Sequence, residues 1–398
     1  MADQIPRQMR ALHLESKEEG LKLKTLPTPE AFHGSAVIKV LAADIISYHQ
    51  QIYDGSRPYP LPMPLVPGSS SIGRVVSVGP DGTKLTPGQL VFSDTDIRSR
   101  DNPSDLFLSA IHHGSTEGSQ KLMRDVWRDG SWAEYQRVPL EDCIVLDEER
   151  LCTELGYSYA QLMYLAHMLV PYGGNQDIGL HAGQNVVIAP ATGGFGGAAH
   201  VAAAMGARVI AMGRNEAELH RIKSTIEDTM PSSAGIMTIK ITGDEEVDTA
   251  ALRSVRGEID SVLDLTPPFA AQATHTLSAI AALKYEGKVS VMGFPDISSS
   301  PSVRWKIVGS NISLKGRLMY SRDCMVQFVK LLESGRFPKG DALVDVKRFM
   351  LEDHEKALAE AASWTGLGKA VVFEPSEHQC CDLAVRCAIF VFGSARRD

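Results

Sequence analysis

The segment from residue 185 to residue 212 constrains the fold more than any other part of this 398-residue chain. It reads NVVIAP, ATGGFGG, an Ala-rich stretch and ARVIAM, which is the order strand, glycine loop, helix, strand. Uninterrupted apolar strands separated by helices indicate a parallel sheet covered on both faces. The alternation continues in apolar runs at 235–242, 259–266, 288–293 and 312–319. The sequence therefore predicts a doubly wound α/β domain.

The glycine loop at 191–197 has nearly the spacing of a dinucleotide-binding motif, because only its first position departs from G-x-G-x-x-G. Glycine at the second position lets the backbone approach a pyrophosphate, and glycine at the third lets the helix pack closely on the strand. An ordinary Gly-rich turn is the alternative, but the flanking strands and helix favour nucleotide binding. The predicted cofactor-binding residues of the loop are Ala191, Thr192, Gly193, Gly194, Phe195 and Gly196.

The turn after the second strand indicates which nucleotide binds. NAD-selective sites place Asp or Glu there to accept hydrogen bonds from the ribose, whereas this chain has Gly213, Arg214 and Asn215. Gly213 leaves room, and the planar fork of Arg214 can pair with a 2′-phosphate. A solvated arginine at the start of a helix is the alternative. The missing acid predicts NADPH rather than NADH.

The ends of two later strands are expected to border the nicotinamide, because ligands bind beyond the carboxyl ends of parallel strands. The residues at these ends are Leu265, Thr266, Gly293 and Phe294.

The first 160 residues differ from the middle of the chain. They are rich in Pro and Gly, with short strand-like runs between turn signals, which predicts an irregular, mostly β domain. A strand–helix–strand unit follows the α/β part. We predict a mostly β part at 1–160, an α/β part at 161–340, the strand–helix–strand unit at 341–375, and an extension at 376–398 that is expected to be poorly ordered.

The composition of the chain limits the classes of partner that it is expected to bind. The chain has 40 basic and 48 acidic side chains, a net charge of −8 that argues against nucleic acid or an anionic membrane as partner. No apolar stretch reaches transmembrane length, the N-terminus lacks a signal-peptide pattern, and the six cysteines form no CxxC pair. These features predict a cytoplasmic protein acting on a small molecule.

Several segments together resemble the medium-chain dehydrogenase/reductase superfamily. PLVPGSSSIGRVVSVG at 64–79, PDGTKLTPGQLV at 80–91, GSWAEYQRVP at 130–139 and the glycine-loop unit occur in that family's order. The resemblance covers about residues 8–375. It implies a GroES-like catalytic domain formed by residues 1–160 and 341–375, with an inserted Rossmann NADP-binding domain at 161–340. Within the superfamily the chain looks like the zinc-lacking quinone oxidoreductase-like and enoyl reductase-like branch, particularly fungal GroES-like alcohol dehydrogenase-type proteins.

The departures from zinc-dependent relatives concern the metal. The alignment puts Ile46 where those relatives have a ligating cysteine, and Ser69 and Ser70 where they have His-Glu. Neither residue type supplies the thiolate or imidazole that zinc prefers. Residues 92–130, which replace the structural-zinc lobe, contain no cysteine. The sequence therefore predicts no metal.

The resemblance also directs attention to the loop at 43–60. Tyr48 aligns with a hydroxyl that relays the alcohol proton in zinc-bearing relatives, and His49 follows it. Tyr59 lies near a tyrosine implicated in protonation in the enoyl reductase branch. These three are the candidate catalytic residues, although tyrosines in such a domain usually pack the ring and bond a carbonyl. Tyr164 and His167 either line the cleft or form a satisfied buried pair.

The resemblance implies a zinc-independent oxidoreductase that transfers a hydride from NADPH to an enone, a quinone or a related apolar, conjugated carbonyl compound. One alternative is a zinc-free alcohol dehydrogenase or ketone reductase. Another is a non-catalytic NADPH-binding sensor or scaffold. The resemblance also suggests a homodimer, although the sequence identifies no interface.

Overall fold

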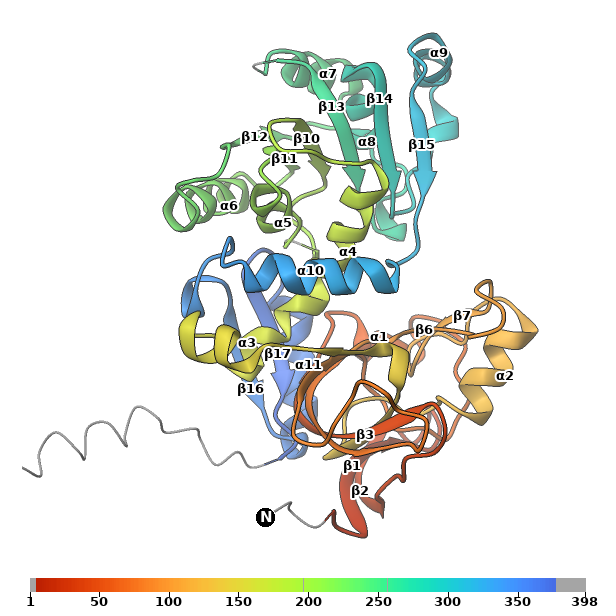
Figure 1. Ribbon diagram of the computed structural model, residues 1–398. Helices are drawn as coiled ribbons and strands as arrows, with labels where there is room; N and C mark the ends of the chain where they lie inside the picture. The colour runs from red at the N-terminus through yellow and green to blue at the C-terminus, as the bar shows by residue number, and fades with distance from the viewer. Residues whose placement is uncertain (1–4, 196, 256, 377–398) are drawn as a thin grey trace, which may run out of the picture.

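The computed structural model describes residues 5–195, 197–255 and 257–376. The predicted cofactor-binding residue Gly196 and nearly all of the predicted extension therefore lie outside the described residues. Two large sheets organise the chain, one with seven strands and one with six (Figure 1). Figure 1 shows them in separate halves of the molecule, joined by α4 (Tyr164–Asp177) and α10 (Arg322–Glu333). The predicted fold class, a mostly β domain plus a doubly wound domain, is confirmed.

The larger sheet is built from both ends of the chain. Its order is β16-β17-β3-β4-β5-β9, with β8 paired to β3, and all its pairings except β16–β17 are antiparallel. Its final two strands bring the chain back from the other domain. Their bounds are β3 Ser35–Asp44, β4 Ser71–Val78, β5 Leu90–Ser93, β8 Tyr135–Pro139, β9 Cys143–Val145, β16 Asp345–Phe349 and β17 Lys369–Phe373.

Smaller elements surround this sheet. Two hairpins lie beside it, and one of them, with a following helix, occupies the segment that replaces the cysteine-rich lobe of zinc-dependent relatives. The hairpins are β1 (Gln8–Leu14) with β2 (Leu21–Pro27), and β6 (Asp96–Arg98) with β7 (Leu106–Leu108). The helices are α1 His49–Tyr53, α2 Glu117–Asp125 and α11 His354–Ser363.

The six-stranded sheet is wholly parallel and has the order β12-β11-β10-β13-β14-β15. The order reverses between β10 and β13, and this switch point is where open α/β sheets bind ligands. The strands are β10 Asn185–Ala189, β11 Arg208–Gly213, β12 Ile236–Lys240, β13 Ile259–Asp264, β14 Leu283–Val291 and β15 Ser313–Gly316. The helices are α5 Ala198–Ala204, α6 Glu216–Thr229, α7 Glu245–Arg253, α8 His275–Ala282 and α9 Pro301–Gly309.

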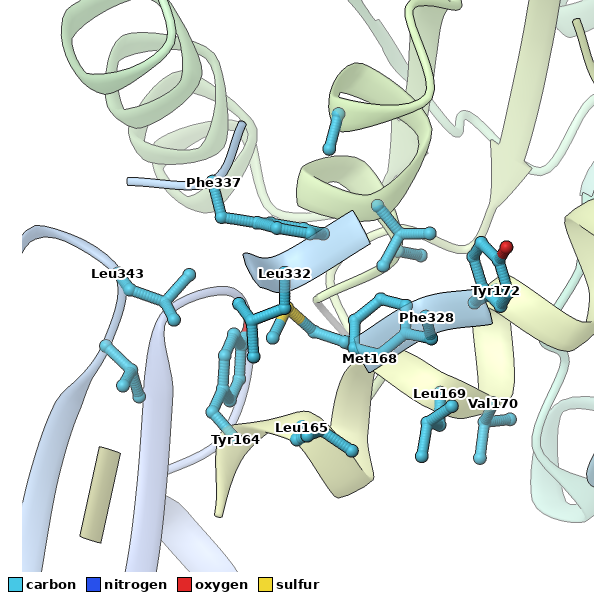
Figure 2. Packing of buried hydrophobic residues seen from close by; sticks show 14 of the residues in the cluster. Tyr164, Leu165, Met168, Leu169, Val170, Tyr172, Phe328, Leu332, Phe337 and Leu343 are labelled. Carbon is cyan, nitrogen blue, oxygen red and sulfur yellow. The ribbon is translucent and has the colours of Figure 1, made fainter. Parts of the chain in front are cut away.

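One hydrophobic cluster joins the two domains. It extends from Ile72 and Val372 in the larger sheet to Val186 in the parallel sheet, passing through α3 (Tyr159–Leu162), α4 and α10. Figure 2 shows Met168 of α4 next to Phe328 and Leu332 of α10 within this cluster. Because burial of such side chains contributes about 1.5–3 kcal/mol each, this cluster holds the domains in a fixed relation. No helix among the described residues is long and apolar enough to cross a membrane.

Candidate active site

The glycine loop lies at the switch point and faces the catalytic domain. Ala191 begins it with a hydrogen bond from its backbone N–H to the Met212 carbonyl, at 2.7 Å. A Cβ added to Gly193 would meet nothing within 4 Å. One added to Gly194 would lie 3.5 Å from Thr365 Oγ1 and 3.7 Å from Ser47 Oγ. This cradle fits a pyrophosphate, because its backbone is open to close approach and hydroxyl groups stand opposite it.

The turn after β11 fits the ribose end of a dinucleotide. A Cβ on Gly213 would lie 2.4 Å from Thr192 Cγ2, so a side chain at this position would displace the loop. Asn215 caps α6 by accepting a hydrogen bond from the Glu218 N–H at 3.1 Å. Arg214 is exposed and makes no ion pair within the described part of the chain. Its charge is therefore available to an anionic ligand.

The strand ends form a polar support under the expected nicotinamide. Thr266 is buried, and its hydroxyl lies 2.6 Å from Asp264 Oδ1 and 2.9 Å from His275 Nε2. Burial, followed by the charge of Arg214, lowers the pKa of His275 to about 4. A Cβ on Gly293 would come within 2.4 Å of the Thr266 backbone, so this packing requires glycine.

The four predicted nicotinamide-bordering residues therefore divide into two kinds. Thr266 and Gly293 are engaged in the strand-end packing. Leu265 is half-buried, and Phe294 is 62% exposed. The latter two are the ones with surface left for a ligand.

A histidine–carboxylate pair crosses between the domains beside the glycine loop. Asp44, the last residue of β3, places Oδ1 3.0 Å from Nε2 of His167, which lies in the first turn of α4. The backbone of Asp44 is fixed on both sides, because its N–H donates to the Ser70 carbonyl at 3.1 Å and its carbonyl accepts from Trp132 Nε1 at 3.0 Å. Asp44 is only 2% exposed, so the pair is shielded from solvent.

The surroundings of His167 favour its protonated form. Burial lowers the pKa of His167, but the charge of Asp44, the hydrogen bond to it and a hydrogen bond to the Gly194 backbone together raise the pKa above 6.5. The neighbouring Tyr164 ring stacks on the imidazole with centroids 5.8 Å apart, and its hydroxyl accepts from the Gly368 N–H at 2.8 Å. His167 thus links the Asp44 carboxylate to the glycine loop.

The predicted catalytic tyrosines both contact the side chain of one arginine. The Arg57 guanidinium carbon is 4.2 Å from the Tyr48 ring centroid and 4.9 Å from that of Tyr59. The Tyr48 hydroxyl makes no hydrogen bond within the described residues. Burial and the neighbouring Tyr59 raise the pKa of Tyr48 to about 12, although the charge of Arg57 opposes the shift. Tyr48 is therefore a protonated, unengaged donor at neutral pH.

The third candidate, His49, is part of the core. It is fully buried, its ring contacts those of Tyr53 and Trp132, and its Nδ1 accepts from the Ile46 N–H at 3.0 Å. Burial lowers the pKa of His49 to about 4, so the imidazole is neutral. This environment favours a role in fixing the loop.

The positions aligned with zinc ligands do not suit zinc. The Ile46 side chain offers no donor atom, and Ser70 Oγ donates to Asp94 Oδ1 at 3.1 Å. Ser69 is buried, with no hydrogen-bond partner for its hydroxyl among the described residues. Across residues 5–195, 197–255 and 257–376, no three His, Cys, Asp or Glu side chains are grouped so as to hold a metal ion.

A second polar group also crosses between the domains. Tyr320, from the segment between β15 and α10, donates a hydrogen bond from its hydroxyl to Asp94 Oδ1 at 2.9 Å. Asp96 and Asp142 lie nearby, and each of the three carboxyl groups has one buried oxygen without a partner among the described residues. Arg98 approaches Asp96 at 3.3 Å. A cleft of about 310 Å³ opens beside this group.

Sequence reasoning missed Asp44 and this aspartate group. One signal for Asp44 was present, since an acidic residue ends a largely apolar strand at the start of the candidate loop. Its partner His167 is 123 residues away, so only the fold brings the two together.

Comparisons with known proteins agree with this architecture. Residues 33–148 match the alcohol dehydrogenase GroES-like domain. An L-threonine 3-dehydrogenase of Streptomyces coelicolor is 27% identical over 379 residues, which cover 92% of this chain and 99% of that protein.

Two solved structures share the fold. A thermostable alcohol dehydrogenase from Pyrobaculum aerophilum is 22% identical with a TM-score of 0.65, covering 92% of this chain and 100% of that one. Acetophenone reductase from Geotrichum candidum, in complex with NAD, is 17% identical with a TM-score of 0.66, covering 93% and 98%. At these identities the likenesses show that the fold is shared.

Proposed function

We propose that this medium-chain dehydrogenase/reductase-type oxidoreductase is a zinc-independent reductase that uses NADPH to reduce an enone, a quinone or a related carbonyl compound. The observation that carries the proposal is the Asp44–His167 pair, buried beside Gly194 where the two domains meet. This contact places an imidazole and a carboxyl group next to the glycine loop. The positions aligned with zinc ligands carry Ile46, Ser69 and Ser70.

NADPH as the bound form is supported by the ribose end of the cradle. Arg214 presents an unpaired guanidinium there, and no Asp or Glu occupies the turn. A guanidinium stabilises a phosphate through charge-assisted hydrogen bonds. The expected test is that Arg214→Asp shifts the ratio of kcat/KM for NADPH over NADH about 100-fold toward NADH. Arg208→Asp, at the opposite end of β11 and equally exposed, is the matched control.

The chain's own residues supply the proton and the positioning. When bound, the nicotinamide supplies the hydride. The Tyr48 hydroxyl donates to the substrate oxygen and passes its proton there as negative charge develops. The pKa of about 12 keeps Tyr48 protonated until that moment. Asp44 and His167 are positioning residues, because they tie the catalytic loop to Gly194 and set the charge that acts on Tyr48.

A second candidate function follows from the relatives. Because the curated relative named above is an L-threonine 3-dehydrogenase that aligns along nearly its whole length, alcohol oxidation is a candidate for this chain as well. The same Tyr48 hydroxyl would then accept the hydrogen bond from the substrate alcohol and pass its proton onward.

The experiment that separates these functions measures products. Purified protein is incubated with NADPH and 2-cyclohexenone, 1,4-benzoquinone or acetophenone, and separately with NAD⁺ or NADP⁺ and L-threonine. Loss of the C=C bond or reduction of the quinone supports the proposal, and loss of C=O alone supports a ketone reductase. Threonine oxidation in the absence of any reductase activity would overturn the proposal. NADPH binding without turnover of any acceptor would identify a binding protein instead.

A further inference from the structure

Arg57 is held in place by its loop and by two aromatic rings. Its N–H donates to the Gln51 carbonyl and its carbonyl accepts from the Tyr59 N–H, each at 2.7 Å, so the segment folds back on α1. The guanidinium then lies within 5 Å of the Tyr48 and Tyr59 ring centroids. Each such contact contributes about 0.5–2 kcal/mol, which orients the cation without neutralising it.

The charge of Arg57 has no counterion in the part of the chain that the structure describes. Within the described residues its guanidinium forms no ion pair and no hydrogen bond. Asp54, the acid nearest in sequence, instead accepts the Ser56 N–H at 2.8 Å. An arginine carries N–H donors in a planar fork that matches a carboxylate with two parallel hydrogen bonds. Arg57 is therefore an unpaired donor group, half-buried and already oriented.

Arg57 also lies close to the reacting region. It stacks on Tyr48, the proposed proton donor, and its charge acts on the Tyr48 hydroxyl together with that of Asp44. The next residue toward the cofactor, Ser47, has its hydroxyl 3.7 Å from the position of a Cβ on Gly194. A substrate whose oxygen bonds Tyr48 therefore passes near the Arg57 fork.

We propose that Arg57 binds a carboxylate of the substrate, so that the physiological substrate is an anionic keto acid or unsaturated oxo acid rather than a neutral carbonyl compound. The inference rests on the proposed function, since it places the reducible carbonyl at Tyr48. A carboxylate fits better than a phosphate, because the site as described offers one planar cation in contact with two tyrosine rings.

The first test measures binding without turnover. Isothermal titration calorimetry follows 4-oxopentanoate and its methyl ester added to the protein saturated with NADP⁺, which supplies no hydride. We expect the acid to bind at least 10-fold more tightly than the ester. In Arg57→Gln this preference is lost, and in Arg57→Lys part of it remains because the charge is kept without the fork. Equal affinities of acid and ester for the unmodified protein would overturn the inference.

The second test measures catalysis with a matched pair, 4-oxo-2-pentenoate and its methyl ester, with NADPH. Arg57→Gln should lower kcat/KM about 10–100-fold more for the acid than for the ester, the usual effect of losing a hydrogen bond to a charged group. Arg124→Gln, on an exposed helix of the same domain, is the control and should change neither. An equal loss for acid and ester would show that Arg57 only packs Tyr48.

The two tests separate the inference from the function on which it rests. Selective binding of the acid with no oxidation of NADPH would support the Arg57 site and remove the reductase proposal. Turnover of both compounds, with no acid preference and no effect of Arg57→Gln on the ratio, would keep the reductase and overturn the Arg57 site.

Discussion

Asp44 meets a basic partner across the domain boundary, whereas Asp94 meets a neutral one. The first contact joins the carboxylate to His167 at 3.0 Å, and the second joins it to the Tyr320 hydroxyl at 2.9 Å. Both aspartates are nearly excluded from solvent. A buried carboxylate with a cationic partner remains ionised, whereas one among other carboxylates takes up a proton.

The consequence appears in the pKa directions. Asp44 contributes to raising the pKa of His167, which favours the charged pair. In the other group, burial raises the pKa of Asp94 to about 6, and burial together with the charge of Asp94 raises the pKa of Asp96 to about 7. The contact beside the glycine loop therefore pairs a carboxyl with a base, whereas the second contact belongs to a group of several carboxyls.

The largest expected effect comes from breaking the contact between Asp44 and His167. Asp44→Asn leaves the imidazole buried without its counterion, which costs about 3–5 kcal/mol in the free energy of unfolding. It also removes a charge that acts on Tyr48, so we expect kcat to fall about 100-fold and its pH profile to shift. Urea unfolding at pH 7 and steady-state kinetics check both, with the exposed Asp125→Asn as control. A variant indistinguishable from the parent in stability would contradict the account.

The double variant sharpens the interpretation. Asp44→Asn with His167→Gln replaces both charges with neutral amides, so it should recover part of the stability lost in the single variant. Strict additivity of the two single effects would show that the residues do not interact.

Removing a carboxyl from the group formed by Asp94, Asp96 and Asp142 should increase the stability of the protein. The pKa of Asp96 is higher in the folded protein than its ordinary 3.8, so its contribution to stability is lost as pH rises from about 4 through about 7. The amide introduced by Asp96→Asn cannot ionise. We therefore expect the free energy of unfolding of this variant to exceed that of the parent by about 1–2 kcal/mol at pH 8 and to differ little from it at pH 4. A loss of stability at pH 8 would indicate that the ion pair with Arg98 dominates.

The contribution of His167 to stability changes over a higher pH range than that of Asp96. Because the folded pKa of His167 is raised above 6.5, its pairing contributes fully below about pH 6.5 and is lost as pH rises through the folded value. The stability difference between the parent and His167→Gln should therefore shrink by about 1 kcal/mol between pH 6 and pH 9. Thermal unfolding across this range measures it, and a pH-independent difference would argue against an ionised pair.

The smallest expected effect concerns Tyr320. Its hydroxyl hydrogen bond lowers the pKa of Asp94, so Tyr320→Phe should raise that pKa further and destabilise the protein by about 1 kcal/mol above pH 7. At pH 5, where Asp94 is mostly protonated, the difference should be smaller. Equal destabilisation at both pH values would indicate lost packing rather than a lost hydrogen bond to a carboxylate.

Local pattern predicted the cofactor domain well, because each feature there lies within a short stretch. The apolar run before Ala191 became β10, and the absence of an acid after β11 was visible beside Gly213. The loop glycines could be interpreted individually for the same reason. Strand, turn and helix signals in this region all indicate the same fold.

The two cross-domain contacts were beyond such reasoning. Asp94 and Tyr320 are 226 residues apart, and neither lies in a motif. His49 looked like a catalytic acid next to Tyr48, but the fold encloses it between Tyr53 and Trp132. Burial decides whether a histidine is a core residue or a proton donor, and burial depends on strands that come from both ends of the chain.

Zinc titration of the purified protein tests the central claim most directly. The protein is treated with a chelator, its metal content is measured, and NADPH oxidation by an enone is followed as zinc is added from zero to several equivalents. The account predicts full activity in metal-depleted protein and no increase on addition of zinc, with activity falling in Tyr48→Phe but not in the exposed control Tyr285→Phe. Activity that is absent after chelation and returns in proportion to one bound zinc per chain would contradict it.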